Sequence, residues 1–219
     1  MIGRRLMKTL VNEKHSIHVL SRHAGTNLPG GVRLSVWDPP KGEPPADSLR
    51  EADAVIHLAG EPVAQRWSAE VRERIRSSRV DGTRNLVQAL ARLPQRPATL
   101  VCASAVGYYG SRGDETLTES SAPGTDFLAE VCRDWEKEAR AAEALGMRVV
   151  MVRTGVVLDS RGGALQRMLP PFRMGAGGKL GDGQQWMPWI HAHDLVNLYH
   201  FALDQPFQGP VNEIGRAHV

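Results

Sequence analysis

Short apolar runs alternate along this chain with longer segments of helical periodicity, and this alternation is the strongest constraint on its fold. The apolar runs end in polar or glycine-containing turns, which is typical of buried strands. Because the connections are long enough for crossovers, the sequence predicts an α/β protein with a doubly wound parallel sheet. We expect strands at Ile17–Leu20, Val32–Val36, Ala54–Leu58, Leu100–Ala103 and Met147–Arg153, and helices at Gly3–Lys14, Ser68–Leu93, Asp126–Leu145 and Asp194–Leu203.

The segment after residue 158 is less regular. Gly162–Gly183 contains many glycines and the Pro170-Pro171 step, which predict a short helix followed by a mobile loop. Trp186–Ile190 has the pattern of a short edge strand. The glycines could let backbone N–H groups approach a phosphate, or they could belong to a flexible lid, and their spacing favours neither.

The overall composition excludes several classes of protein. The chain has 219 residues, of which 42% are hydrophobic and 23% charged, as in a soluble globular domain. No apolar run approaches the roughly 18 residues that span a bilayer, and the N-terminus has no apolar core of a signal peptide. The net charge of +3 is spread along the chain. We therefore expect a cytoplasmic protein that binds neither membranes nor nucleic acid.

The cysteines and histidines show no metal-binding spacing. Cys102 and Cys132 fall in apolar or helical patterns, which fits reduced thiols better than a disulfide. Neither a CxxC nor an HExxH motif occurs, so the sequence predicts no metal site.

The stretch Thr99–Gly110, TLVCASAVGYYG, is the strongest candidate for a functional site. Its apolar part predicts a buried strand, and Ser104, Tyr108 and Tyr109 follow where that strand ends. Ligands of open α/β sheets bind at the carboxyl ends of strands. The alternative is that Ser104 packs against backbone while the two tyrosines cap the core, and the stretch alone does not separate the two interpretations.

Several segments together resemble the extended short-chain dehydrogenase/reductase superfamily of the NAD(P)-dependent epimerase/dehydratase type. The resemblance is narrower to the small "epimerase family" proteins, which are labelled sugar-nucleotide epimerase or cell-division-inhibitor-like, and it covers nearly the whole chain. It implies a Rossmann-type domain that binds NADP(H) and acts on an unidentified substrate, such as a nucleotide-sugar or another small polar molecule. The segments are VLSR (Val19–Arg22), HLAG (His57–Gly60), RW…SSRVDGT (Arg66–Thr83), SAVGYYG, FLAEVCRDWE (Phe127–Glu136), RTGVVL (Arg153–Leu158), LPPFRMGAGG (Leu169–Gly178) and WIHAHDL (Trp189–Leu195).

The resemblance assigns a set of residues to the cofactor. Ser21-Arg22 stands where the second strand of such folds ends beside the adenosine ribose, and an arginine without an acidic residue there favours a 2′-phosphate, hence NADP over NAD. Small residues after the next strand would let the cofactor approach the backbone. The predicted cofactor-binding residues are Gly3, Ser21, Arg22, Leu58, Ala59, Gly60, Arg79 and Val157, with solvated surface charges as the alternative for Arg22 and Arg79.

The two ends of the chain depart from the family pattern. Relatives begin with a strand and a GGTGFIG-like turn, of which only the last residues, ending at Gly3, remain here. We therefore interpret the chain as truncated at both ends, with unpaired backbone expected between the neighbours of that central strand. The expected division is a cofactor domain at 1–158, substrate-side segments at 159–212 and a non-native tail at 213–219.

The usual catalytic pair of the superfamily, Tyr-x-x-x-Lys, is also missing. By spacing from Ser104 it would fall near Glu130 and Asp134, which we expect on a solvated helix face. The remaining catalytic candidates are Ser104, to bond a substrate oxygen, and Tyr108 or Tyr109, to donate a proton. Trp189 and His191 are expected in the substrate pocket, with a structural histidine as the alternative for His191, and Asp194 is expected near a helix N-terminus.

Three interpretations of function remain open from the sequence. The chain could be an NADP(H)-dependent oxidoreductase or epimerase, a catalytically weak NADP(H)-binding or regulatory protein, or an inactive fragment of either. The missing Tyr-x-x-x-Lys favours the second over the first. Relatives of this type often dimerise through the two long helices, so we also expect a homodimer through Ser68–Leu93 and Asp126–Leu145.

Overall fold

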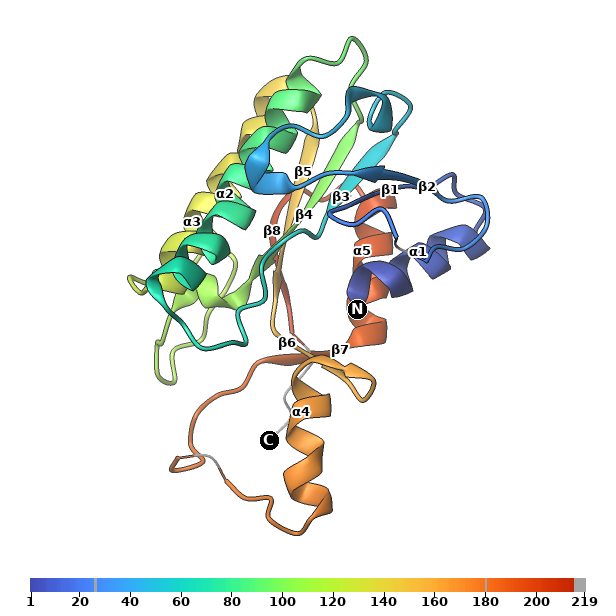
Figure 1. Cartoon of the computed structure of the whole chain (residues 1–219). Helices are drawn as coiled ribbons and strands as arrows, with labels where there is room; N and C mark the ends of the chain where they lie inside the picture. Colours follow the sequence, from blue (N-terminus) through green and yellow to red (C-terminus); the bar gives the residue numbers. More distant parts are fainter. Residues whose placement is uncertain (26, 180, 215–219) are drawn as a thin grey trace.

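A parallel four-stranded sheet forms the centre of the molecule (Figure 1). The computed structural model describes residues 1–25, 27–179 and 181–214. The strands lie in the order β3 (Ala54–His57), β4 (Thr99–Ala105), β5 (Arg148–Thr154) and β8 (Gly209–Glu213), and every neighbouring pair is parallel. The apolar side chains of β4 and β5 are almost wholly inaccessible because both strands are flanked on each side and covered on each face.

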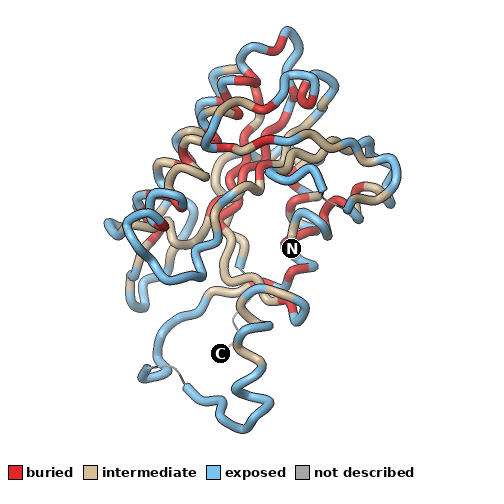
Figure 2. The backbone as a smooth tube through the Cα atoms, viewed as in Figure 1, coloured by how far each residue is buried: buried red, intermediate tan, exposed pale blue. Residues whose placement is uncertain are grey.

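Helices cover both faces of this sheet, which confirms the doubly wound architecture. On one face, α2 (Ala69–Ala91) and α3 (Phe127–Arg140) pack on a core that includes Leu100 and Met151. On the other face, α1 (Ile2–Asn12) and α5 (Ala192–Asp204) enclose a second core that includes Val101 and Val150. Alternate residues of one strand thus point to different cores, as the pleat requires. Figure 2 shows the buried residues concentrated along the strands and the helix faces that meet them.

A separate two-stranded parallel sheet, β1 (His18–Ser21) with β2 (Arg33–Val36), lies on the β3 side of the molecule. No ladder of backbone hydrogen bonds joins β1 to β3 within the part of the chain that the structure describes. All of β1 and the first three residues of β3 are only half-buried. The pair β1-β2 is therefore a sheet of its own beside the four-stranded sheet.

Helix starts follow the local chemistry. The Ser68 hydroxyl accepts a hydrogen bond from the Val71 N–H, and the Asp126 carboxylate accepts from Leu128 and Ala129, so both residues cap long helices as N-cap residues do. Several predicted bounds were wrong, among them those of α3 and α5. α3 ends at Arg140 and passes into a 3₁₀ turn, Ala141–Leu145, and α5 begins at Ala192 rather than Asp194, with His191 as its N-cap.

Two strands were not predicted from the sequence. β6 (Val156–Asp159) follows β5 after a single glycine, so the two read as one apolar run. β8 has the composition GPVNE, in which glycine, proline and asparagine disfavour a strand, yet tertiary pairing with β5 overrides this preference. Glu213, expected in a non-native tail, is the last residue of β8, and residues 215–219 lie outside the described residues.

A smaller unit projects from the carboxyl end of the sheet. It consists of β6, β7 (Trp189–His191) and α4 (Gly163–Arg173), and β6 pairs with β7 in parallel. Figure 1 shows it below the main body, and no residue of α4 is buried. Pro170 and Pro171 lie inside this helix, and the loop that follows is exposed over its described residues. Whether this unit forms a separate substrate-side region remains a prediction.

Other connections are short 3₁₀ turns at Pro39–Lys41, Ala46–Ser48 and Val106–Tyr109. Cys102 and Cys132 are buried free thiols, as expected. Over the described residues, every helix is too short or too polar to cross a lipid bilayer.

Candidate functional site

Three neighbouring strands bring polar side chains together at the carboxyl end of the sheet. Ser104 on β4 pairs in register with Arg153 on β5, and Arg153 pairs in register with Asn212 on β8. Glu136 approaches from α3, and Tyr109 comes from the 3₁₀ turn after β4. The five side chains form one continuous hydrogen-bonded set, which we call the Arg153 network.

The Glu136 carboxylate and the Arg153 guanidinium form the centre of the Arg153 network. The Nε and Nη2 atoms of Arg153 donate to the two carboxylate oxygens at 2.8 Å each, in the parallel arrangement that suits these two groups. Glu136 is 4% exposed and Arg153 1% exposed, so the pair is shielded from water. Burial lowers the pKa of Arg153, but hydrogen bonds to Glu136 and Tyr109 outweigh this and raise it above its usual value.

Ser104 and Tyr109 both use their hydroxyl groups inside the Arg153 network. The Ser104 hydroxyl donates to Glu136 Oε1 at 2.7 Å. The Tyr109 hydroxyl donates to Asn212 Oδ1 at 2.6 Å and accepts from Arg153 Nη1 at 2.8 Å. Both residues are buried. They lie together at the end of the strand, as a functional site requires, but their hydroxyl groups are bonded to other side chains of the protein, as a structural role requires.

Tyr108 differs from its neighbour because it is only half-buried. Its ring centroid lies 3.5 Å from Arg153 Cζ, so the guanidinium stacks on the aromatic face. Tyr108 also lines a surface pocket of about 230 Å³ with Glu136 and three basic side chains of α3, Arg133, Lys137 and Arg140. The structure thus places an accessible tyrosine between a buried cation and a basic pocket.

A second group of predicted residues lies around the loop that follows β3. Glu61, directly after Gly60, has carboxylate oxygens 3.8 Å from Arg22 Nη1 and 3.8 Å from Arg74 Nε. Arg79 Nη1 donates to the Glu61 carbonyl at 3.0 Å. Arg22 follows β1, whereas Arg74 and Arg79 both lie on α2, so three arginines converge near the end of β3. Two of them, Arg22 and Arg74, are about half exposed and can meet an anion.

Arg79 supports the loop from within the protein. A Cβ on Gly60 would lie 3.1 Å from Arg79 Cζ, so the loop and the guanidinium are in close contact. The same guanidinium lies 5.2 Å from the Trp135 ring centroid, and burial lowers its pKa. The alternative of a solvated surface charge is therefore wrong for Arg79, although a direct contact with cofactor stays a prediction.

The remaining predicted residues lie at the same end of the molecule. The helix α1 starts at Ile2, and a Cβ on Gly3 would contact Leu58 at 3.6 Å, so the N-terminus of α1 faces the loop after β3. Val157 and His191 lie on the paired strands β6 and β7, where Trp189 is half-buried and His191 is exposed. Ser21 ends β1. Their contacts with cofactor or substrate stay predictions.

The expected position of the missing catalytic pair holds no such chemistry. Glu130 is exposed, and Asp134 forms an ion pair at 2.8 Å with Arg76 of α2. The carboxylate that takes part in the Arg153 network is that of Glu136, two residues after Asp134. Glu136 was not assigned a role from the sequence, yet it falls on the apolar face of α3 with Cys132 and Ala139, and a charged residue on such a face indicates a buried partner. Asn212 carried no comparable signal.

Comparisons with known proteins show the family of the chain. The family model described as "NAD dependent epimerase/dehydratase family" matches residues 1–215. A chloroplastic SDR39U1 homologue of Arabidopsis thaliana is 42% identical over 224 residues, covering 96% of this chain and 62% of the relative. An epimerase family protein of Mycobacterium bovis is 42% identical over 221 residues, covering 100% of this chain and 71% of the relative. The chain thus spans about two thirds of these relatives' length.

Solved structures give the same result. The human epimerase family protein SDR39U1, solved with NADPH, superimposes with a TM-score of 0.82 at 33% identity, covering 98% of this chain and 70% of that chain. A nucleoside-diphosphate sugar epimerase from Corynebacterium glutamicum superimposes with a TM-score of 0.82 at 42% identity, covering 97% of this chain and 43% of that chain.

Proposed function

Because the chain belongs to the NAD dependent epimerase/dehydratase family, we propose that it binds NADP(H) and acts as an oxidoreductase or epimerase on a small polar molecule. The observation that carries the choice of NADP(H) is the convergence of Arg22 and Arg74 on Glu61 at the carboxyl ends of β1 and β3. Two guanidinium groups against one carboxylate leave a net positive charge, which suits a 2′-phosphate. The NADPH found in the structure of the human relative supports the same choice.

The residues at this end fit a dinucleotide. Leu58, Ala59 and Gly60 form the loop after β3. Ser21 ends β1 and Arg22 follows it, and the N-terminus of α1 faces the same loop. A helix N-terminus favours the negative charge of a pyrophosphate. When bound, the cofactor would exchange a hydride with the substrate. The protein's own part is to hold the adenosine end with Arg22 and Arg74, and Arg79 holds the loop in place.

A tyrosine beside Arg153 would supply the proton. Tyr108 is the better donor of the two tyrosines because its side chain reaches the surface pocket, whereas the Tyr109 hydroxyl is committed to Asn212 and Arg153. In the superfamily pattern, a lysine makes the tyrosine a better acid. Here Asp134 stands near the expected lysine position, and the Arg153 guanidinium, stacked on the Tyr108 ring, would hold that ring at the pocket. Ser104 and Glu136 would keep Arg153 in position.

A second candidate function is NADP(H) binding without turnover. It is favoured by one observation: the Ser104 and Tyr109 hydroxyls, the groups first expected to meet a substrate, both have buried partners inside the protein. Under either candidate function, we also propose that the protein forms a homodimer through α2 and α3 and is located in the cytoplasm.

Titration with the reduced cofactors tests the first part of the proposal. The fluorescence of NADPH and of NADH should change on binding, with NADPH bound at least about tenfold more tightly because of its additional charge-assisted hydrogen bonds. The protein with bound NADPH should then oxidise it when offered a carbonyl substrate, and Tyr108→Phe should stop this while leaving NADPH affinity unchanged. Tight NADPH binding without oxidation of any carbonyl offered supports the second candidate. Equal affinity for the two cofactors contradicts the NADP(H) proposal.

A further inference from the structure

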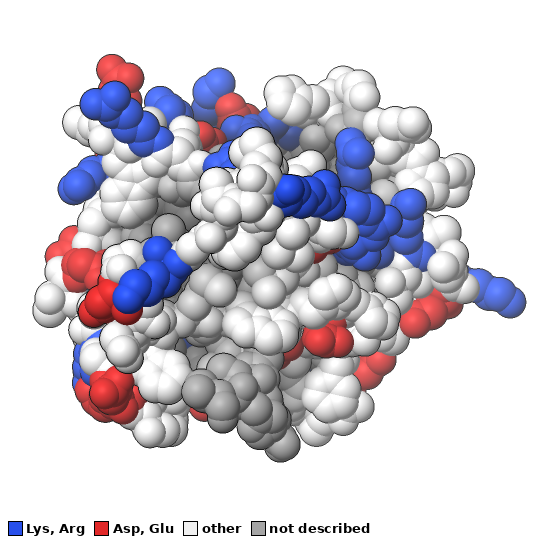
Figure 3. Space-filling view, turned by 90° about the horizontal axis from the view of Figure 1, so that it is seen from below, with Lys and Arg blue, Asp and Glu red and all other residues white. Residues whose placement is uncertain are grey.

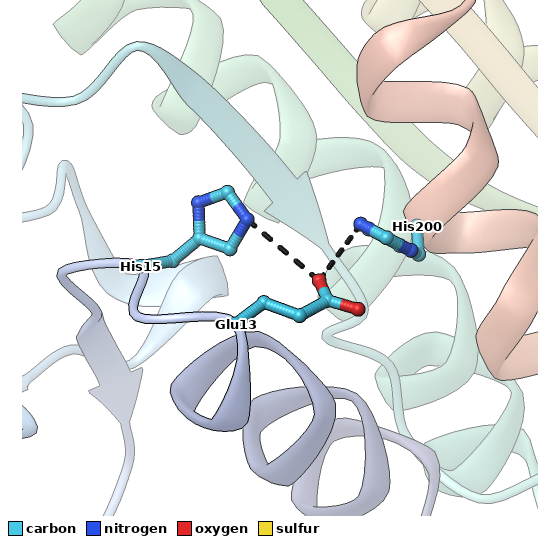
Figure 4. Close-up of side chains that lie close together, drawn as sticks. All are labelled: Glu13, His15 and His200. Atoms are coloured by element: carbon cyan, nitrogen blue, oxygen red, sulfur yellow. Dashed lines mark ion pairs between the residues drawn. The ribbon is translucent and has the colours of Figure 1, made fainter.

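A cluster of two histidines and a glutamate lies at the end of the sheet opposite to the Arg153 network. Glu13 is the C-cap residue of α1, His15 lies two residues later, and His200 lies on α5 (Figure 4). His15 precedes the start of β1, and α5 ends shortly before β8 begins. The cluster therefore lies at the amino-terminal ends of the strands, whereas the Arg153 network lies at their carboxyl ends.

The ligand atoms converge in the way that a metal ion requires. Glu13 Oε2 lies 2.9 Å from His200 Nε2 and 3.8 Å from His15 Nε2, and all three atoms lie within 4.8 Å of one another. A tetrahedral zinc ion with bonds near 2.0–2.1 Å separates its ligand atoms by about 3.3 Å. The two shorter separations lie on either side of this value, so small side-chain rotations suffice to surround an ion.

The protein holds the three residues from a packed base. Leu10, on the last turns of α1, and Tyr199, beside His200 on α5, both lie in the core that α1 and α5 share. Lys14 has φ of 67°, a left-handed conformation that turns the chain back and brings His15 beside Glu13. The backbone of the cluster is thus fixed by burial, while the imidazole and carboxylate groups remain open to solvent.

We propose that Glu13, His15 and His200 bind a divalent transition-metal ion of the zinc type. Two imidazole nitrogens and one carboxylate oxygen are ligands that zinc prefers, whereas magnesium and calcium prefer oxygen alone. Asp204 is the candidate fourth ligand: its Oδ2 lies 3.8 Å from His200 Nε2, one helical turn away, and its side chain is 66% exposed and free to rotate. The ion would join the end of α1 to α5 and so stabilise the helical layer on that face of the sheet.

Metal titration of the whole chain tests this site. Protein freed of metal with a chelator is titrated with Zn²⁺ by calorimetry, and with Co²⁺ followed by its visible absorption, which is intense only in tetrahedral sites. We expect one ion per chain. Removal of a direct ligand should weaken binding by at least about tenfold, since loss of an outer-shell partner alone costs this much at zinc sites. The variants are His200→Ala, His15→Ala and Glu13→Gln.

The matched control is His193→Ala, which removes an exposed histidine from the first turn of the same helix. Its Zn²⁺ affinity should equal that of the parent protein. Zn²⁺ should also raise the melting temperature of the parent and of His193→Ala but not that of His200→Ala. The proposal is overturned if no ion binds, or if His200→Ala binds Zn²⁺ as tightly as the parent. Neither result depends on cofactor binding or turnover.

Discussion

The Glu136 carboxylate on α3 and the Arg153 guanidinium on β5 form a buried ion pair with two parallel hydrogen bonds of 2.8 Å. This pair fastens a helix of one layer to the centre of the sheet. It also provides the acceptor for the Ser104 hydroxyl and the cation for both tyrosines. The polar residues at the carboxyl end of the sheet are therefore organised around this ion pair. Removing either partner would leave the other charge buried without a counter-ion, which lowers the stability of the protein.

Glu136→Gln should destabilise the protein strongly. It leaves the Arg153 charge buried without its counter-ion, and breaking one partner of such a pair costs about 3–5 kcal/mol. Urea unfolding, followed by circular dichroism, measures the free energy of unfolding. The matched control is Asp134→Asn on the same helix, which breaks an ion pair with the partly exposed Arg76. Since such pairs contribute about 0–1 kcal/mol, equal losses in the two variants would contradict this account.

The two adjacent tyrosines should respond differently to loss of the hydroxyl. Tyr109→Phe removes the hydrogen-bond partner of Asn212 Oδ1 and one of the two acceptors of Arg153 Nη1, which keeps only the Glu119 carbonyl; this loss costs about 1–3 kcal/mol. Tyr108→Phe keeps the ring against Arg153 and should change the free energy of unfolding by less than about 0.5 kcal/mol. Thermal unfolding of the two single variants compares them directly. A larger loss for Tyr108→Phe would disprove the assignment of the buried partner to Tyr109.

Acidification should destabilise the protein through His57. Burial lowers the pKa of His57 from 6.5 to about 4, and its Nε2 lies 3.1 Å from Thr83 Oγ1. The unfolded chain takes up this proton below pH 6.5 while the folded protein resists it until about pH 4. The stabilisation is therefore complete above pH 6.5 and is lost as the pH falls, by about 3 kcal/mol in total.

His57→Gln tests this assignment. The amide keeps a polar partner for Thr83 but does not titrate. The variant should therefore show a smaller loss of unfolding free energy between pH 6.5 and pH 4 than the parent protein, measured by urea unfolding at a series of pH values. An identical pH dependence in the two proteins would show that His57 is not responsible.

Gly82→Ala should destabilise the protein although alanine favours helices. A Cβ at Gly82 would lie 2.7 Å from the Cβ of Pro39, where α2 crosses the Pro39–Lys41 turn. Overpacking of this kind costs about 1–3 kcal/mol, which exceeds the gain in helix propensity of about 1 kcal/mol. The control is Gly3→Ala in α1, where the new methyl meets Leu58 at an ordinary 3.6 Å. A melting temperature that rises in Gly82→Ala would show that α2 can move away from the turn.

The sequence was sufficient for most of the architecture because burial on both faces leaves a clear signal. The strands β3, β4 and β5 read as apolar runs, and Ser68 and Asp126 stand at the starts of helices with side chains that cap them. β8 could not be found this way. Its residues have little preference for a strand, and it exists because β5 presents an edge to pair with.

The candidate site was only partly predictable for a related reason. Ser104, Tyr108 and Tyr109 were found because they are close in sequence and follow one strand. Their partners Glu136, Arg153 and Asn212 come from three other elements, and only the fold brings them together. Likewise, Glu13 and His15 acquire a third ligand from His200, which is far away in the sequence.

The grouping of charges on the surface could not be predicted from the charge count. Figure 3 shows a run of Lys and Arg side chains across the right-hand half of the face seen from below, with acidic side chains elsewhere on the same face. A net charge of +3 gives no sign of such local grouping. The absence of nucleic-acid binding accordingly stays a prediction.

The adenosine end of the proposed cofactor site can be tested by itself with two small ligands. Calorimetric titration with adenosine 2′,5′-bisphosphate and with adenosine 5′-monophosphate measures the contribution of the 2′-phosphate alone. The parent protein should bind the bisphosphate at least about tenfold more tightly, and Arg22→Ser should bring the ratio close to one. Arg33→Ser, which removes a comparably exposed arginine paired with Glu51, should leave the ratio unchanged. Equal binding of the two ligands by the parent, or a ratio that survives Arg22→Ser, would contradict the account.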